Sequence, residues 1–327
     1  MLEVSDAMSA FIDDHLTAAA HPEKKTRALA HAALDPAVLN FEYDPLVTLT
    51  SAEAFAARKG NCLTFSSLFI AMAREAGLDA WYQEVEVPPE WNSVKETLLV
   101  TMHVNAVVRH RGSQYTIDIS RIGQAPHAKV RRISDGEARA QYLNNLGADA
   151  LVDSDLPRAY AYFRAAIRTH PGLAYTWSNL GVVFKRNGQV EDARSAYLEA
   201  LRLDSRNSTA LNNLQIIHVE QGDFAAAAAI RARVEKNRRS NPYYLLHLAR
   251  VANDEMRHAE AVDLLERAIR LKKDDYRFHL ALAESLDRSG RHDLAQHSLE
   301  RARRLLPPGA ENVERVLSGA AHAEGSP

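Results

Sequence analysis

Residues 60–77 read GNCLTFSSLFIAMAREAG, and this stretch decides the fold of the chain's N-terminal half. Asn61 can cap a helix that begins at Cys62, and Gly77 ends it. The helix is apolar nearly all round, which is typical of a helix buried at the centre of a domain. The sequence therefore predicts a domain that is built around this helix.

Cys62 is the only cysteine among 327 residues, and it stands at the predicted helix start. A thiol attacks as the thiolate, and the unsatisfied N–H groups and macrodipole of a helix start stabilise that anion. Taken alone, Cys62 is better explained as a small buried apolar residue, which is a common fate of a free cysteine. A single cysteine excludes an intrachain disulfide and any cluster of cysteine ligands, so the chain tolerates a reducing compartment without requiring one.

Segments on both sides of this helix are predicted to complete the domain. Before it, residues 5–20 and 23–33 are expected to form helices, and residues 41–49 an irregular or extended segment. Ser51 is expected to cap a short helix over residues 52–58.

Two segments after the helix are predicted to be paired strands. Residues 98–109 place apolar side chains at every even position, which indicates a strand packed on the core. Residues 110–113 supply a tight turn, and residues 114–120 return as the partner strand. An earlier strand is expected over residues 81–87.

The hairpin brings a histidine close to an aspartate. We pair Arg109 with Gln114 across the turn. Asn105 then faces Asp118, and His103 becomes the diagonal neighbour of Asp118 on the same face. A slip of two residues would set His103 directly opposite Asp118. In either register both side chains lie on the polar face, where the helix could present its thiol.

These residues can form a nucleophilic site. His103 can deprotonate Cys62, and Asp118 can hold the imidazole in the required orientation. The residues that could line this site are Asn61, Asn105, Trp81 and Trp91. The two tryptophans could equally belong to the core, because aromatic side chains near strands more often do. The 14 histidines include no close pair flanked by further ligand types, so we predict no metal site and no cofactor.

The C-terminal half repeats every 34 residues. A leucine marks each unit and an alanine follows it by 13 positions: Leu146, Leu180, Leu214, Leu248 and Leu282, with Ala159, Ala193, Ala227, Ala261 and Ala295. The pattern predicts five helix pairs over residues 140–309, then a capping helix and a tail over residues 310–327. Residues 131–137 are expected to form a short, fixed junction in which Ser134 starts the first repeat helix.

This pattern resembles the tetratricopeptide repeat. Trp177, Leu180, Gly181 and Tyr197 of the second unit match its consensus, and the third unit, with Arg231 at a usually aromatic place, matches least. The resemblance implies an all-α solenoid whose concave groove binds a protein or peptide, although solvation alone could explain the same polar faces. The candidate groove residues are Asn144, Tyr175, Ser178, Lys185, Arg186, Asn212, Tyr243 and Arg250.

Three motifs resemble the transglutaminase-like superfamily of papain-type folds: Gly60-Asn61-Cys62, His103-Val104-Asn105 and Tyr115-Thr116-Ile117-Asp118. The resemblance covers about residues 45–122 and implies an α+β papain-like domain, over residues 1–135, with a catalytic triad of Cys62, His103 and Asp118. Animal transglutaminases commonly have Gly-Gln-Cys-Trp and His-Ala-Trp at these motifs, so their tryptophan and calcium-linked features are not carried over. Bacterial members are more often thiol proteases, peptidases or amidases, and some have lost activity.

Two functions remain open at this level. The first is a thiol-dependent acyl-transfer enzyme, an amide hydrolase, protease or transglutaminase-type enzyme, whose repeats bind protein. The second is a catalytically inactive adaptor whose repeats scaffold a complex. The net charge of −2 gives no sign of a nucleic-acid or membrane surface. No apolar stretch is long enough to span a bilayer. Without a visible signal peptide we expect a cytoplasmic location, or a periplasmic one if an upstream segment is missing.

Overall fold

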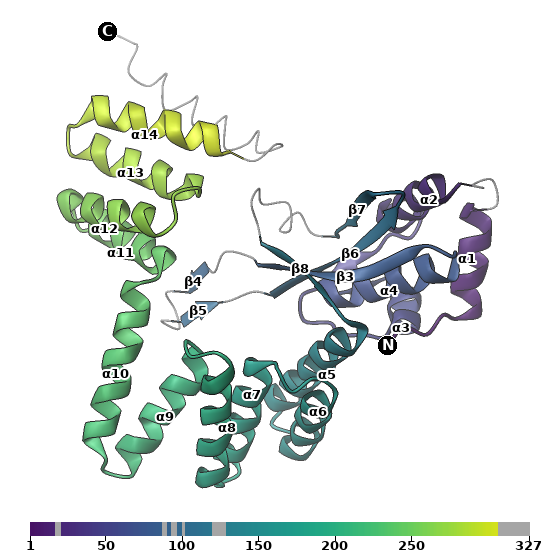
Figure 1. The fold of residues 1–327 in the computed structure, drawn as a ribbon, viewed down its shortest axis with the longest axis horizontal. Coiled ribbons are helices and arrows are strands. Elements are labelled where there is room, and N and C mark those ends of the chain that lie inside the picture. Colours follow the sequence, from purple (N-terminus) through teal and green to yellow (C-terminus); the bar gives the residue numbers. More distant parts are fainter. Residues whose placement is uncertain (17–20, 87–89, 93–96, 100–101, 120–128, 307–327) are drawn as a thin grey trace. The chain divides into compact units, whose positions relative to one another are not determined.

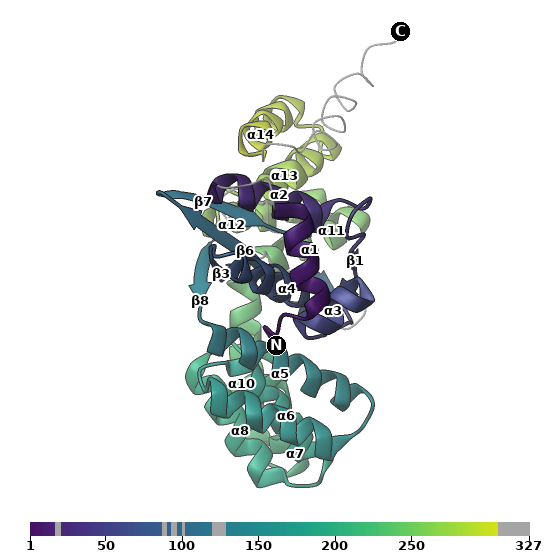
Figure 2. The ribbon, with the colours of Figure 1, turned by 90° about the vertical axis from the view of Figure 1, so that its right-hand side faces the viewer.

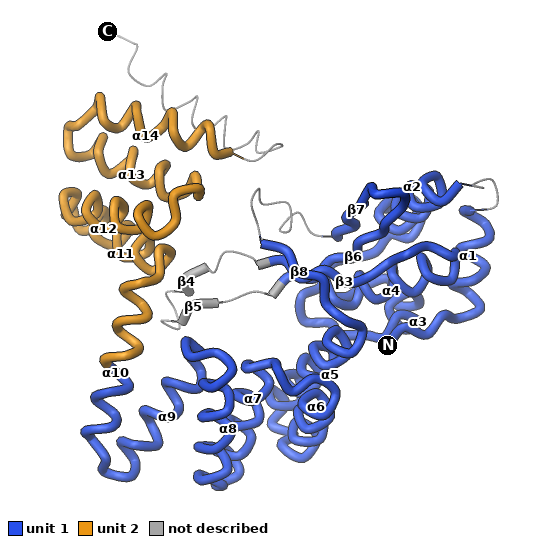
Figure 3. Tube along the Cα trace, viewed as in Figure 1, with its two compact units in different colours: residues 1–87, 102–123, 128–231 blue, residues 88–101, 124–127, 232–327 orange. Residues whose placement is uncertain are grey.

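The structure is a computed structural model, and it describes residues 1–16, 21–86, 90–92, 97–99, 102–119 and 129–306. The chain divides into two compact units (Figure 3). The first contains residues 1–87, 102–123 and 128–231, and the second contains residues 88–101, 124–127 and 232–327. The first unit therefore holds both the N-terminal domain and the first repeats.

A four-stranded antiparallel sheet runs through the N-terminal domain. Its order is β7 (Ser113–Ile117), β6 (Met102–His110), β3 (Asp79–Glu86) and β8 (Val130–Ile133). Arg109 of β6 pairs with Gln114 of β7, which confirms the predicted hairpin register. Arg111 and Gly112, at the turn, both have positive φ, the backbone geometry that matches the twist of a two-residue hairpin.

Helix α4 (Cys62–Glu75) packs on β3 and β6, and every residue from 63 to 73 is buried, as the sequence predicts (Figure 1). Alternate residues of β6, among them Val104 and Ala106, join the same hydrophobic core. Tyr82 of β3 fixes the two layers further, because its hydroxyl donates a 2.9 Å hydrogen bond to Ser67 of α4.

Three helices pack around α4: α1 (Asp6–Leu16), α2 (Pro22–Leu34) and α3 (Ser51–Ala57) (Figures 1 and 2). The cap of α3 corrects a prediction, because Thr50 caps this helix in place of Ser51. The Thr50 hydroxyl accepts from the Glu53 amide, and the Glu53 carboxylate accepts from the Thr50 amide. Ser51 instead donates to the carbonyl of Met1.

Two pairs of short strands differ from the prediction. β1 (Glu42–Tyr43) pairs in parallel with β2 (Lys59–Gly60), and β4 (Glu90–Asn92) pairs with β5 (Thr97–Leu99). The single strand expected over residues 98–109 is therefore divided between β5 and β6. The edge strand β8 is also absent from the prediction.

Ten helices follow in the described part of the chain, and they form five pairs in the 34-residue register. They are α5 (Asp135–Val152), α6 (Leu156–Thr169), α7 (Ala174–Arg186), α8 (Val190–Leu203), α9 (Ser208–Glu220), α10 (Phe224–Arg239), α11 (Pro242–Asp254), α12 (His258–Leu271), α13 (Tyr276–Arg288) and α14 (His292–Leu305). The boundary between the compact units falls within α10, in the third and least regular repeat. The capping helix expected after residue 310 lies outside the described residues.

The repeat signature has a steric cause. A Cβ atom at Gly181 would lie 2.5 Å from the ring of Tyr197, and one at Gly147 would lie 2.7 Å from the ring of Phe163. Both rings are fully buried. The helices of these pairs therefore approach so closely that only glycine fits opposite the aromatic side chain.

A helix cap and several ion pairs hold the junction to the repeats. Ser134 caps α5 by accepting from the amide of Glu137 at 3.1 Å. Arg74, at the end of α4, forms a bidentate ion pair with Asp135 at 2.6 and 2.9 Å. Arg131 of β8 pairs with both Glu84 of β3 and Glu137 of α5. The N-terminal sheet and the first repeat helix are thus bound together within the first unit.

Candidate active site

The start of α4 is held in a fixed geometry. Asn61 accepts from the amide of Thr64 at 2.9 Å and donates to the hydroxyl of Thr48 at 2.9 Å. A Cβ atom at Gly60 would lie 2.3 Å from a methyl carbon of Thr64, so the residue before Asn61 must be glycine. Cys62 is consequently the first residue of the helix, partly exposed and with a free thiol.

His103 of β6 and Asp118, which follows β7, form a buried pair. The His103 Nε2 and Asp118 Oδ2 atoms lie 2.7 Å apart, and the two side chains are only 2% and 6% exposed. Because Asp118 engages Nε2, the ring nitrogen left for the thiol of Cys62 is Nδ1. The observed register of β6 and β7 therefore makes His103 the diagonal neighbour of Asp118 and brings the two side chains into contact.

His103 favours its charged form. Burial opposes the imidazolium, but hydrogen bonds to Asp118 and to Cys62, together with negative charge on both, raise the pKa of His103 to about 9. An ordinary histidine titrates near 6.5. At neutral pH the ring therefore carries a proton, which it can hold against a thiolate or donate to a leaving group.

Tyr43 is a site residue that sequence reasoning missed. It lies opposite Gly60 in the parallel pair of β1 and β2, and it is 37% exposed. Burial and the nearby charges of Cys62 and Asp118 raise the pKa of its hydroxyl. The phenol therefore stands at the rim of the site. A two-residue parallel pairing has no periodic signal, so no sequence pattern could have found it.

Comparison with known proteins identifies two kinds of family along the chain. Residues 12–134 match the model of the family described as Transglutaminase-like superfamily. Residues 174–207 and 213–276 match two models described as Tetratricopeptide repeat. The chain is a transglutaminase-like domain followed by tetratricopeptide repeats.

Curated relatives share only parts of the chain. Cellulose synthase 2 operon protein C of Komagataeibacter xylinus is 31% identical over 168 residues, which are 49% of this chain and 12% of that protein. BBSome complex member BBS4 of Mus musculus is 32% identical over 94 residues, which are 29% of this chain and 18% of that protein. The chain thus spans less than a fifth of either relative.

A solved structure titled "Functional Characterization of Pseudomonas Aeruginosa pilF" is also similar, with a TM-score of 0.31 and 21% identity. The match covers 54% of this chain and 81% of that one.

Two tryptophans were also predicted to line the site, and the structure describes the surroundings of one of them, Trp81. Trp81 is opposite Val107, four residues along β6 from His103. The guanidinium groups of Arg109 and Arg132 lie 5.5 and 4.5 Å from the centroid of its ring. The structure thus packs Trp81 on the sheet. Trp91 belongs to β4, and its side chain lies outside the described part of the structure.

Several predicted groove residues of the tetratricopeptide repeats are engaged inside the first unit. Asn144 accepts from Asn179 at 3.1 Å, and Ser178 donates to Asn207 at 2.8 Å. Both Asn144 and Ser178 are buried. Their amide and hydroxyl groups therefore hold neighbouring repeat helices together.

Other groove candidates are more accessible. Lys185 forms a 3.5 Å ion pair with Glu220, and Arg186 donates to the carbonyl of Leu151 at 2.9 Å. Tyr175 is partly buried, and its pKa is raised by burial and by the nearby carboxylates at the junction. Asn212 is exposed.

In the second unit Tyr243 is buried and donates to Asp275 at 3.0 Å, whereas Arg250 is exposed. The candidate set therefore divides into side chains that pack between helices and side chains that reach solvent.

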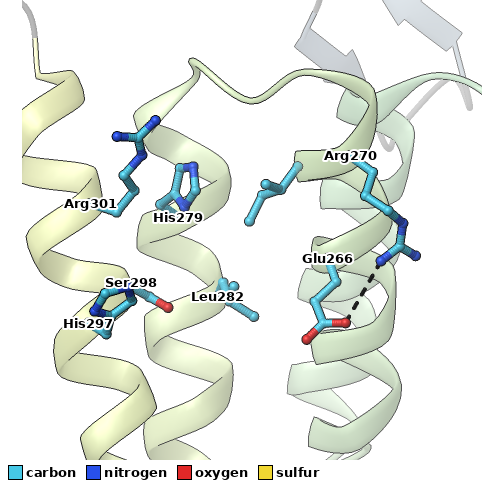
Figure 4. Close-up of a pocket in the computed structure, with 8 residues that line it drawn as sticks. Glu266, Arg270, His279, Leu282, His297, Ser298 and Arg301 are labelled. Atoms are coloured by element: carbon cyan, nitrogen blue, oxygen red, sulfur yellow. Dashed lines mark ion pairs between the residues drawn. The ribbon is translucent and has the colours of Figure 1, made fainter.

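A pocket of about 420 Å³ lies among the last repeats of the second unit (Figure 4). Arg270 of α12, His279 of α13 and Arg301 of α14 line it, and Arg270 pairs with Glu266 at 3.9 Å. The pocket has the chemistry of a charged repeat surface and no thiol for acyl transfer.

Neither a metal site nor a membrane span is found among the residues that the structure describes. No three histidine, cysteine or carboxylate side chains come together there as ligands. None of the described helices is both long and apolar enough to cross a bilayer.

Proposed function

We propose that this protein is a thiol-dependent acyl-transfer enzyme that acts on the amide or ester carbonyl of a protein substrate bound by its repeats. One observation carries the proposal: a buried His103 with a raised pKa, hydrogen-bonded to Asp118 and to a Cys62 at a helix start. A thiolate beside an imidazolium is the reactive form of a nucleophilic cysteine.

The reaction follows from these positions. His103 holds the proton that the Cys62 thiol has given up, and the resulting thiolate attacks the carbonyl carbon. The imidazolium then donates its proton to the departing amine or alcohol, which leaves an acyl group on the sulfur. Water or an amine attacks this acyl-enzyme with His103 as the base, which gives hydrolysis or transfer and restores the thiol. Asp118 holds the imidazolium in orientation throughout.

Two groups are suited to stabilise the oxyanion. The amides of Thr64 and Phe65 already donate to Asn61, to its side chain and its carbonyl respectively. The first available group is therefore the backbone amide of Cys62. The amide of Cys62 belongs to the first turn, where N–H groups have no partner within the helix. The second group is the hydroxyl of Tyr43, whose pKa is raised by burial and by the nearby charges of Cys62 and Asp118. Donors aimed at the developing charge are commonly the largest single contribution to such catalysis.

The alternative is an adaptor whose transglutaminase-like domain is inactive. The match to a protein that is named as a member of a complex favours this alternative. The two functions differ in one measurable property, the reactivity of the thiol.

Alkylation of Cys62 by iodoacetamide tests the proposal, because the chain has one cysteine and the label reports one site. The rate should remain high near pH 6, and His103→Ala should lower it by about tenfold or more at that pH. His110→Ala, at the last residue of β6, serves as the control and should leave the alkylation rate unchanged. A rate that rises only above neutral pH and ignores His103→Ala would support the adaptor.

A further inference from the structure

Three polar side chains form one row across the sheet, perpendicular to its strands. Gln83 of β3 is directly opposite Asn105 of β6. Asn105 is in turn opposite Asp118 when the register of β6 and β7 is extended by one residue beyond Ile117. His103 precedes Asn105 by two residues and so shares its face.

The row is joined by hydrogen bonds. The Gln83 Nε2 atom donates to the Asn105 Oδ1 atom at 3.3 Å. The Asn105 Nδ2 atom donates to Asp118 Oδ2 at 3.5 Å, and this is the oxygen that His103 Nε2 contacts at 2.7 Å. Asn105 is only 1% exposed. A buried amide in such a place is retained for its hydrogen bonds, because an unpaired one is costly.

The direction of these bonds follows from chemistry. An ionised carboxylate can only accept, so the amide of Asn105 must turn its NH₂ group toward Asp118. Its oxygen then points toward β3 and requires a donor. Gln83 supplies that donor through its own NH₂ group. Each residue of the row therefore fixes the orientation of the next.

We propose that Asn105 is a positioning residue, which holds the carboxylate of Asp118 against His103, and that Gln83 orients Asn105 for this role. The catalytic meaning of this row rests on the proposed function, whereas its effect on His103 does not. Asn105 belongs to the His103-Val104-Asn105 motif, where this chain departs from the His-Ala-Trp of animal transglutaminases. At this position the amide of Asn105 can therefore donate a hydrogen bond to the carboxylate of Asp118.

The test is a double-mutant cycle in a Cys62→Ala background, which removes the thiol and any activity. The measured quantity is the titration midpoint of His103 in ¹⁵N-histidine spectra, where its signal is identified by its loss in His103→Ala. Asn105→Leu keeps the side-chain volume but removes the amide. It should lower the midpoint by about half a unit to one unit. With Asp118→Asn already present, Asn105→Leu should cause no further shift, because Asn105 acts through Asp118.

A second variant keeps the test decisive if Asn105→Leu does not fold. Gln83→Met removes the outer donor from a partly exposed position and should lower the midpoint in the same direction by roughly half as much. Gln114→Met is the matched control, since Gln114 is exposed and lies opposite Arg109 outside the row. The proposal is overturned if Asn105→Leu and Gln83→Met leave the midpoint unchanged. It is also overturned if Asn105→Leu shifts the midpoint equally with and without the carboxylate.

The same variants, with Cys62 restored, separate this inference from the proposed function. Alkylation near pH 6 should slow by about threefold to tenfold in Asn105→Leu if the thiol is activated. A shifted His103 midpoint in a protein whose thiol is unreactive would uphold the positioning role and defeat the enzyme proposal. An activated thiol with an unshifted midpoint would do the reverse.

Discussion

At the scale of single residues, the site depends on one shared proton. His103 lies between an anionic carboxylate and a thiol, and its protonated form satisfies both. The cost of burying that charge is offset only while both partners are present. The electrostatics of the triad should therefore be visible in the stability of the fold as well as in reactivity.

The first prediction concerns pH. Burial lowers the pKa of His103, but its partners raise the folded value to about 9 from an ordinary 6.5. This contribution to the free energy of unfolding is complete below about pH 6.5 and is lost as the pH rises through about 9. Asp118→Asn should thus destabilise by about 2 kcal/mol near pH 6 and by much less near pH 10. Urea unfolding at both pH values measures this, and an equal loss at both would contradict it.

The second prediction concerns Tyr43. A phenol that stabilises the oxyanion should act on acylation, in which a carbonyl oxygen becomes charged, and not on alkylation. Tyr43→Phe should therefore slow acylation of Cys62 by an activated phenyl ester by about tenfold, with little effect on iodoacetamide labelling. Tyr115→Phe, a partly buried tyrosine of β7, is the control. Equal effects on both reactions would assign Tyr43 a structural role only.

At the scale of elements, long periodic segments were predictable and short pairings were not. The apolar run of α4 and the alternation in β6 follow from burial on one helix and one sheet face, and the hairpin register set Asn105 opposite Asp118. β1 with β2, and β4 with β5, are two or three residues long, too short to show a period. Tyr43 was missed for this reason, because only the pairing of β1 with β2 brings it to the site.

The third prediction tests the close approach within a repeat. Gly181→Ala forces a Cβ atom against the ring of Tyr197 and should lower the free energy of unfolding by about 1–3 kcal/mol. Gly136→Ala is the matched control, since the nearest atom to a Cβ there is the Ser134 hydroxyl at 3.8 Å. It should be neutral or stabilising because alanine favours helix. Tyr197→Leu should recover part of the loss in Gly181→Ala, and urea unfolding measures all of these variants.

At the scale of the whole molecule, the transglutaminase-like domain and the first repeats share one compact unit, and α11 to α14 belong to another. Arg131 is the central contact in the first unit, because it pairs with Glu84 of the sheet and with Glu137 of α5. The side chains of both carboxylates are at most 10% exposed. Gln141 of α5 adds a 3.0 Å hydrogen bond to Glu84. Loss of this contact should therefore destabilise the first unit and leave the stability of the second unit unchanged.

The last prediction concerns the two carboxylates, Glu84 and Glu137, that lose their cation when Arg131 is replaced. Arg131→Ala leaves two buried carboxylates side by side without a cation, which should destabilise the first unit by about 2 kcal/mol; the half-exposed arginine keeps this below the value for a fully buried pair. Amide hydrogen exchange should rise in β8, α5 and α6 and stay unchanged in α12 to α14.

Two further variants complete this test. Arg267→Ala, at an exposed position in α12, is the control. Adding Glu84→Gln to Arg131→Ala should restore part of the protection, because it removes one of the unpaired charges and keeps a group that can bond to Gln141. Exchange that rises equally in both units, or no recovery in the double variant, would mean that Arg131 does not join the sheet to the repeats through its ion pairs.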